Sequence, residues 1–181
     1  MLAAAEGTDL ELARFAARGL GELSAYTDLL AVNQVSEAYA VAVASLASGD
    51  IEVRGIGLNL LGELLRQLDA AQMYEAFQLL FAEFDAWDKS YSGSWNEFTA
   101  MVFALESTPE LRFQSGSVEV FLESCRYAQD PGQAATAYPV IVSAMNQGKL
   151  EVFALPSVAG LARKLPEPER SQAVDMIIAA R

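Results

Sequence analysis

The chain has 181 residues, of which 52% are hydrophobic and 20% charged, so it is long enough to bury a core and too apolar to be disordered. The 24 acidic and 12 basic residues give a net charge of −12, which argues against binding to a nucleic-acid backbone. The sequence contains no histidine, the residue used most often for acid–base catalysis and for metal binding.

No stretch approaches the roughly 20 apolar residues of a membrane helix. The first residues, MLAAAEGTD, have neither the basic region nor the long apolar run of a signal peptide. The single cysteine, Cys125, cannot form an internal disulfide, and we expect it to be a small buried apolar residue. These features predict a cytoplasmic protein with one helical domain over residues 1–181, in which residues 1–7 form a frayed lead.

Three amphipathic helices are expected over residues 9–23, 28–48 and 50–64. The first and third align at an offset of 41 residues, which places Asp9 on Asp50. Identical residues then coincide at positions 9/50, 11/52, 20/61, 21/62, 22/63 and 23/64. The unit of helix, turn and helix is therefore an internal repeat.

The helix over residues 50–64 is expected to begin at Asp50, whose carboxylate can accept hydrogen bonds from first-turn amides. Gly55, Gly57 and Gly62 each weaken an isolated helix by about 1 kcal/mol relative to alanine. We therefore expect another backbone to lie close against this helix. Its apolar stripe consists of Val53, Ile56, Leu60, Leu61, Leu64 and Leu68.

A hairpin of about 40 residues whose second helix opens Asp-x-x-Val-Arg and ends Leu-Gly-x-Leu resembles a HEAT or armadillo repeat. The matching residues are Asp50, Val53, Arg54, Leu61, Gly62 and Leu64. The first copy has Ala13 in place of the arginine. The resemblance is clearest over residues 8–70. It implies an all-α fold, a right-handed α-α superhelix of about 8–9 helices. It also implies that the aspartate and arginine tie successive repeats together, and that the second helices line the concave binding surface.

Further helices are expected over residues 71–88 and 94–106, on either side of the polar loop DKSYSGS at 88–94. Thr108-Pro109 and Asp130-Pro131 each combine a helix cap with a proline in the first turn. The last helix is expected over residues 169–181.

Several breaks are expected in the C-terminal half. Ser115-Gly116-Ser117 should interrupt the helix before residues 118–128, and Pro139 and Pro156 should kink or split their helices. The segments TDLEL, GDIEV, GSVEV and GKLEV share one pattern and are interpreted as recurrent helix starts. They occupy residues 8–12, 49–53, 116–120 and 148–152.

Two surfaces are candidate sites for binding another protein. The first is the solvent-facing side of the second helices, where the alternative is an ordinary solvated face. Its residues are Arg14, Arg18 and Glu22 in the first copy and Asn59, Glu63 and Arg66 in the second. The second is the polar loop with Tyr91 and Trp95, because aromatic residues around a flexible loop are typical of interface hot spots. The alternative there is that the tryptophans belong to the core.

No pattern of catalytic residues or phosphate-binding glycines is present, and Glu83 and Asp85 point about 200° apart on a helix. We therefore expect no metal and no cofactor. The favoured hypothesis is a non-catalytic protein–protein binding module or scaffold. One alternative is an acidic inhibitor or immunity protein that blocks a basic enzyme. A second is a carboxylate-based enzyme or a small-ligand binder with a pocket at the kinked C-terminal helices. The net charge argues against nucleic acid and is compatible with a basic protein partner, but the favoured interpretation is that it keeps an alanine-rich protein soluble. The lack of a long apolar run argues against a membrane.

Overall fold

The computed structural model describes residue 19, residues 30–104 and residues 108–179. These residues form eight α-helices and one 3-10 helix, and no strand occurs among them, which confirms the expected all-α class. The elements are α3 (Val32–Leu46), α4 (Ile51–Leu64), α5 (Ala70–Ser90), α6 (Trp95–Ala104), α7 (Pro109–Tyr127), α8 (Pro131–Asn146), η2 (Val152–Ala154), α9 (Leu155–Ala162) and α10 (Glu169–Ala179). Apart from residue 19, the predicted helix at 9–23, including Arg14, Arg18 and Glu22, lies outside the described residues.

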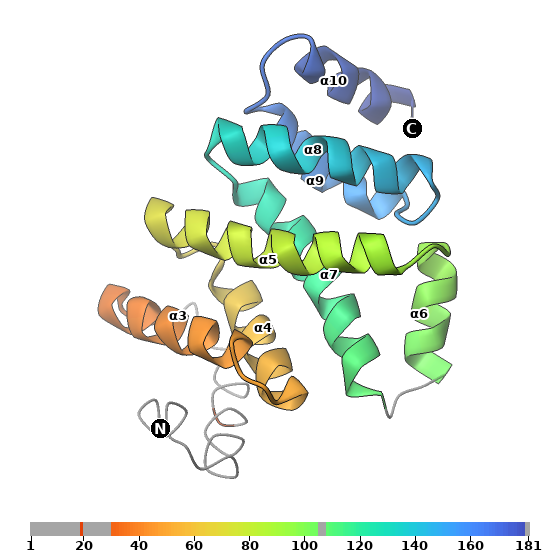
Figure 1. Ribbon diagram of the computed structural model, residues 1–181. Helices are drawn as coiled ribbons and strands as arrows, with labels where there is room; N and C mark the ends of the chain where they lie inside the picture. The colour runs from red at the N-terminus through yellow and green to blue at the C-terminus, as the bar shows by residue number, and fades with distance from the viewer. Residues whose placement is uncertain (1–18, 20–29, 105–107, 180–181) are drawn as a thin grey trace.

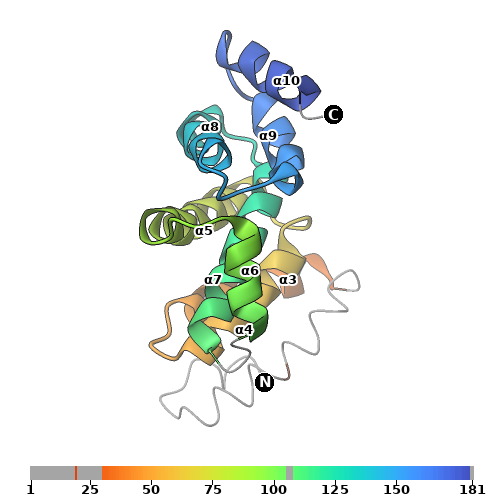
Figure 2. The same ribbon diagram turned by 90° about the vertical axis from the view of Figure 1, so that its right-hand side faces the viewer.

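The helices pack in successive pairs. α4 packs on α3, α7 on α5 and α9 on α8. α5 and α8 lie side by side in one layer, with α7 and α9 behind them (Figures 1 and 2). α4, α7 and α9 also contact one another in that order, while α6 packs on α7 and α10 on α9. α4, α7 and α9, which are the second helices of the three pairs, therefore form one continuous layer. None of the described helices is long and apolar enough to span a bilayer.

The start of α4 follows from its sequence as predicted. The Asp50 carboxylate accepts hydrogen bonds from the backbone amides of Glu52 and Val53, at 2.9 and 3.2 Å. Leu61 and Leu64 of the predicted stripe are fully buried. Burying a leucine side chain contributes about 1.5–3 kcal/mol, so this stripe holds α4 against its neighbours.

Two of the three α4 glycines face close neighbours. A Cβ atom at Gly57 would lie 2.8 Å from the carbonyl oxygen of Ala42 on α3, and one at Gly62 would lie 3.1 Å from the Val120 side chain on α7. The expectation of close contact is wrong for Gly55, which has no atom within 4 Å of such a Cβ position. Gly57 therefore sets the distance between α3 and α4.

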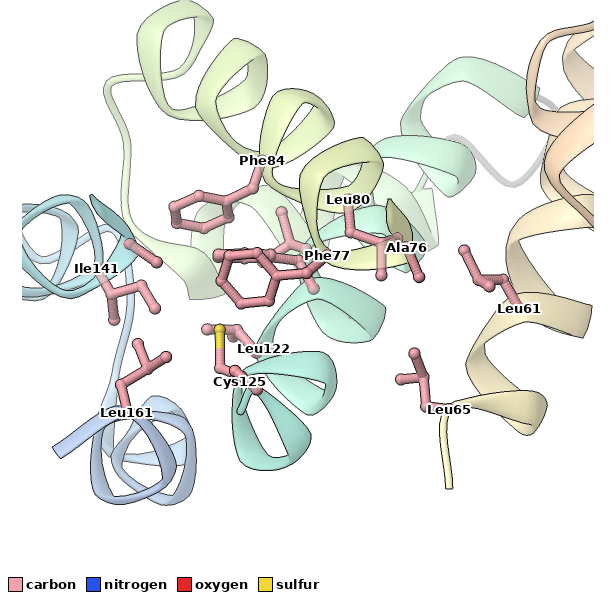
Figure 3. Packing of buried hydrophobic residues seen from close by; sticks show 14 of the residues in the cluster. Leu61, Leu65, Ala76, Phe77, Leu80, Phe84, Leu122, Cys125, Ile141 and Leu161 are labelled. Carbon is pink, nitrogen blue, oxygen red and sulfur yellow. The ribbon is translucent and has the colours of Figure 1, made fainter. Parts of the chain in front are cut away.

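The core is centred on the aromatic face of α5. Phe77 and Phe84 lie between side chains of α7, α8 and α9 on one side and Leu61 of α4 on the other (Figure 3). Phe84 stacks on Phe121 of α7, with ring centroids 4.6 Å apart. Cys125 of α7 is fully buried in this core, as predicted, and its burial raises the pKa of the thiol.

Two polar links join successive helix pairs. Arg54 Nη2 on α4 is 2.6 Å from Glu83 Oε1 on α5, and the Arg54 guanidinium lies 4.2 Å from the centroid of the Phe113 ring on α7. Lys149, which is buried, donates from Nζ to Asp88 Oδ1 at 2.8 Å and to the Asp88 carbonyl oxygen in the last turn of α5. Arg54 thus links α4 to α5 and α7, while Asp50 caps α4.

The predicted breaks in the C-terminal half are largely wrong. α7 runs without interruption through Ser115-Gly116-Ser117, where Ser117 Oγ donates to the Gln114 carbonyl at 2.8 Å. The segment at 116–120 is therefore not a helix start. Gly116 packs closely against α4, since a Cβ there would lie 3.2 Å from the Leu58 side chain. Pro139 does not split α8, and Pro156 lies in the first turn of α9, where a missing amide costs little.

Candidate functional site

The predicted residues Asn59, Glu63 and Arg66 line one side of a groove. Asn59 and Glu63 are exposed on α4, one helical turn apart, and Arg66 is exposed in the turn that directly follows α4. Asn59 and Glu63 share a hollow of about 420 Å³ with residues of α7. This central hollow is lined by Asn59, Gly62, Glu63, Glu119, Val120 and Glu123. The close approach of Gly62 to Val120 forms its floor.

The central hollow continues in both directions between the two helices. Toward the start of α4 and α7 it shares Asn59 with a hollow of about 340 Å³ whose lining includes Arg112 and Gly116. Toward their ends it shares Gly62, Glu63 and Glu123 with a hollow of about 270 Å³ that is also lined by Arg66 and Tyr127. These three hollows form one surface, which we call the α4–α7 groove.

A network of polar side chains orders one end of the groove. Arg66 Nε donates to the Tyr127 hydroxyl at 2.9 Å, and this hydroxyl donates to Glu123 Oε1 at 3.1 Å. Arg126 Nη1 binds Glu123 Oε2 at 2.6 Å. Partly exposed pairs of this kind each contribute about 0–1 kcal/mol to stability. Their effect is therefore mainly to orient the Glu123 carboxylate.

Glu119 is a carboxylate on the α7 side of the groove. Among the described residues no lysine or arginine forms an ion pair with it. Although its side chain is partly exposed, desolvation raises the pKa of the carboxyl, and a hydrogen bond with the Ser115 side chain lowers it in part. A cation placed next to Glu119 would favour its charged form and offset this desolvation.

Tyr91 and Trp95 lie in a different part of the molecule. The Tyr91 ring packs against Trp87 and Phe98, at centroid distances of 5.8 and 5.0 Å, and its hydroxyl donates to the Ser94 carbonyl at 3.1 Å. Trp95 is 8% exposed. The reason for assigning Tyr91 to an interface, an aromatic ring without cover, is therefore wrong. α5 extends to Ser90, which places the ring one turn beyond Trp87 on the core side.

The acidic side chains in the second half of α5 take separate partners. Glu83 binds Arg54, Asp85 binds Lys89 and Asp88 binds Lys149. Across residues 30–104 and 108–179, no group of three or more cysteine, aspartate or glutamate side chains could hold a metal ion.

The sequence analysis did not identify the residues of α7 that line the other side of the groove. Glu119, Glu123 and Tyr127 recur every four residues, so they share one face of α7. This four-residue spacing is visible in the sequence, but by itself it indicates only a polar helix face. The packing of α7 on α4 places that face beside Asn59 and Glu63 and makes it part of the groove.

Comparison of the chain with protein-family models, curated proteins and solved structures gives no match. The geometry of the α4–α7 groove is therefore the basis for the function proposed next.

Proposed function

We propose that the protein is a non-catalytic binding module, and that its helix pairs are units of a right-handed, HEAT-like α-α superhelix. The order of contacts supports this arrangement, because α4, α7 and α9 are the second helices of three successive pairs and pack on one another. The Arg54 link from α4 to α5 and α7 also supports it.

The surface that we assign to partner binding is the α4–α7 groove. The observation that carries the assignment is that Asn59, Glu63 and Arg66 lie in hollows that join into one groove between two second helices. Carboxylates and an amide in a concave surface suit an extended protein segment with basic side chains, since charge-assisted hydrogen bonds to carboxylates are strong and directional. Glu119 offers such a segment a carboxylate that no described cation neutralises.

Site-specific photocrosslinking in the cells that make the protein tests this proposal. A photoreactive amino acid at Asn59, in the groove, should give a discrete adduct with another protein. The same amino acid at Gln78, an exposed position on α5, is the matched control. Adducts of equal yield from both positions, or from Gln78 alone, would contradict the groove as the binding surface.

The second candidate function is inhibition of a basic enzyme, and the net charge of −12 favours it. In that case long-range electrostatic attraction between the acidic protein and the basic enzyme would dominate the rate at which they associate. The association rate should then fall steeply as salt rises to physiological levels, where the Debye length is about 8 Å. A rate that is nearly independent of salt would remove this candidate and leave the scaffold.

A further inference from the structure

A hollow rich in basic side chains lies where the α4–α7 groove ends. It has a volume of about 360 Å³ and shares Arg66 and Tyr127 with the groove. Its lining consists of Leu65, Arg66, Leu68, Met73, Arg126, Tyr127, Ala128, Gln129, Gly160, Arg163 and Lys164. Four of these residues are cationic, in a protein with twice as many acidic as basic residues. We call it the basic hollow.

Two of the four cations form no ion pair within the described part of the chain. Arg66 and Arg126 approach Glu123, at 3.9 and 2.6 Å. Arg163 and Lys164 are exposed, and no carboxylate of the described residues forms an ion pair with either of them. The basic hollow therefore presents positive charge that the described part of the fold does not neutralise.

Helix dipoles offset only part of this charge. α4, α7 and α9 all end at the basic hollow, and each helix end carries about half a negative charge. Together with Glu123, which pairs with Arg66 and Arg126, these ends offset part of the four positive charges. The positive charge that remains favours binding of carboxylates.

The base of the hollow is apolar and tightly packed. Leu65 and Met73 are 1% and 4% exposed. At Gly160, a Cβ atom would lie 2.6 Å from the Cys125 carbonyl oxygen, so the backbone of α9 rests directly on α7. Charged groups that bind against such a surface are partly removed from water, which strengthens their attraction.

We propose that the basic hollow binds acidic side chains of the same partner segment whose basic side chains enter the central hollow, and that the two hollows together fix the direction of that segment. The inference rests on the proposed function, since it assigns chemistry to a partner of the α4–α7 groove. An arginine can bind a carboxylate through two parallel hydrogen bonds, and Arg163 lines the basic hollow without an ion pair to any described carboxylate. The adjoining carboxylates of the central hollow accept lysine or arginine.

A nucleic acid fits this surface poorly. A strand that placed a phosphate in the basic hollow would continue into the groove, where it meets Glu63, Glu119 and Glu123. Repulsion from these carboxylates opposes the counterion release that drives binding of a phosphate backbone. A protein segment with mixed charge avoids this conflict.

Three fluorescein-labelled peptides of identical composition test the proposal by fluorescence anisotropy. The first has a block of lysines, a glycine spacer and a block of glutamates; the second has the blocks in reverse order; the third alternates lysine and glutamate. One block order should bind the wild-type protein at least about five-fold more tightly than the alternating peptide. Equal affinities for all three peptides, or no binding, would overturn the inference.

Charge-reversal variants test whether the preference for the block peptide comes from the basic hollow. Lys164→Glu, alone or with Arg163→Glu, should abolish the preference for the block peptide. Lys89→Glu is the matched control, because Lys89 is an exposed lysine on α5 outside both hollows, and it should preserve the preference. Equal loss in Lys89→Glu and Lys164→Glu would overturn the inference.

The double variant should also bind an all-lysine peptide more tightly than the wild-type protein does, a gain that misfolding cannot produce; absence of this gain contradicts the inference. The peptides replace the natural partner in every arm. Failure here therefore leaves the crosslinking test of the α4–α7 groove unaffected.

Discussion

Replacing Gly57 or Gly55 of α4 by alanine should change stability in opposite directions. At Gly57 the new Cβ would lie 2.6 Å from Ser45 Cβ, 2.8 Å from the Ala42 carbonyl oxygen and 3.0 Å from the Leu46 amide nitrogen. At Gly55 it would meet nothing within 4 Å. The two glycines are two positions apart in one helix, so each serves as the control for the other.

The magnitudes follow from two opposing effects. Alanine in place of glycine in a helix gains about 1 kcal/mol, and at Gly55 this gain should appear almost in full. At Gly57 the same gain is opposed by overpacking, which costs about 1–3 kcal/mol or more when the neighbours cannot move. Two of the three contacts are backbone atoms of α3, so we expect the upper part of that range. The two variants should differ by about 2–3 kcal/mol.

Chemical denaturation followed by circular dichroism at the helical band measures this difference directly. The midpoint should rise for Gly55→Ala and fall for Gly57→Ala, with unchanged slopes, since neither change alters the surface exposed on unfolding. If Gly57→Ala stabilises the protein as much as Gly55→Ala does, the close contact of α3 with α4 is incorrect.

Three further perturbations test other parts of the fold. Lys149→Met leaves the Asp88 carboxylate without its partner and should lower the free energy of unfolding by about 3 kcal/mol in denaturant titration; a change below about 0.5 kcal/mol would contradict the buried pair. Burial and the Glu75 carboxylate raise the pKa of Tyr39 above its ordinary value. The neutral Tyr39 side chain therefore adds to the free energy of unfolding below about pH 10, and this contribution is lost as the pH rises further. The Tyr39→Phe protein has no phenol to ionise at this position, so its free energy of unfolding should fall less than that of the wild type over the alkaline range. Tyr91→Ser should lower the melting temperature by several degrees, because the aromatic contacts of the ring are lost. An unchanged melting temperature would contradict the packing of Tyr91 against Trp87 and Phe98.

Local signals predicted the helices well where capping and periodicity agree. Asp50 and Asp130 directly precede α4 and α8, and each carboxylate accepts at least one hydrogen bond from a first-turn amide. Thr108 directly precedes α7 as predicted, but its side chain makes no capping hydrogen bond. The run Ser115-Gly116-Ser117 misled because its small side chains and glycine favour a turn in isolation. In the structure Gly116 lies close to the Leu58 side chain of α4, and tertiary packing outweighs local preference.

The site was only half predictable for the same reason. Asn59, Glu63 and Arg66 follow from the polar face of one amphipathic helix. Glu119 and Arg163 come from helices that meet this face only after folding, and no spacing in the sequence relates α4 to α7 or α9. Surfaces built by several helices depend on long-range contacts that periodicity does not encode.

The affinity of the partner recovered by crosslinking at Asn59 tests the central claim most directly. Calorimetric titration of that partner should show a loss of about ten-fold or more for Glu119→Lys, because the change places a cation inside the central hollow. Glu37→Lys makes the same change of charge at an exposed position on α3, and its affinity should stay within about two-fold of wild type. Equal losses for the two variants, or none for Glu119→Lys, would contradict binding in the α4–α7 groove.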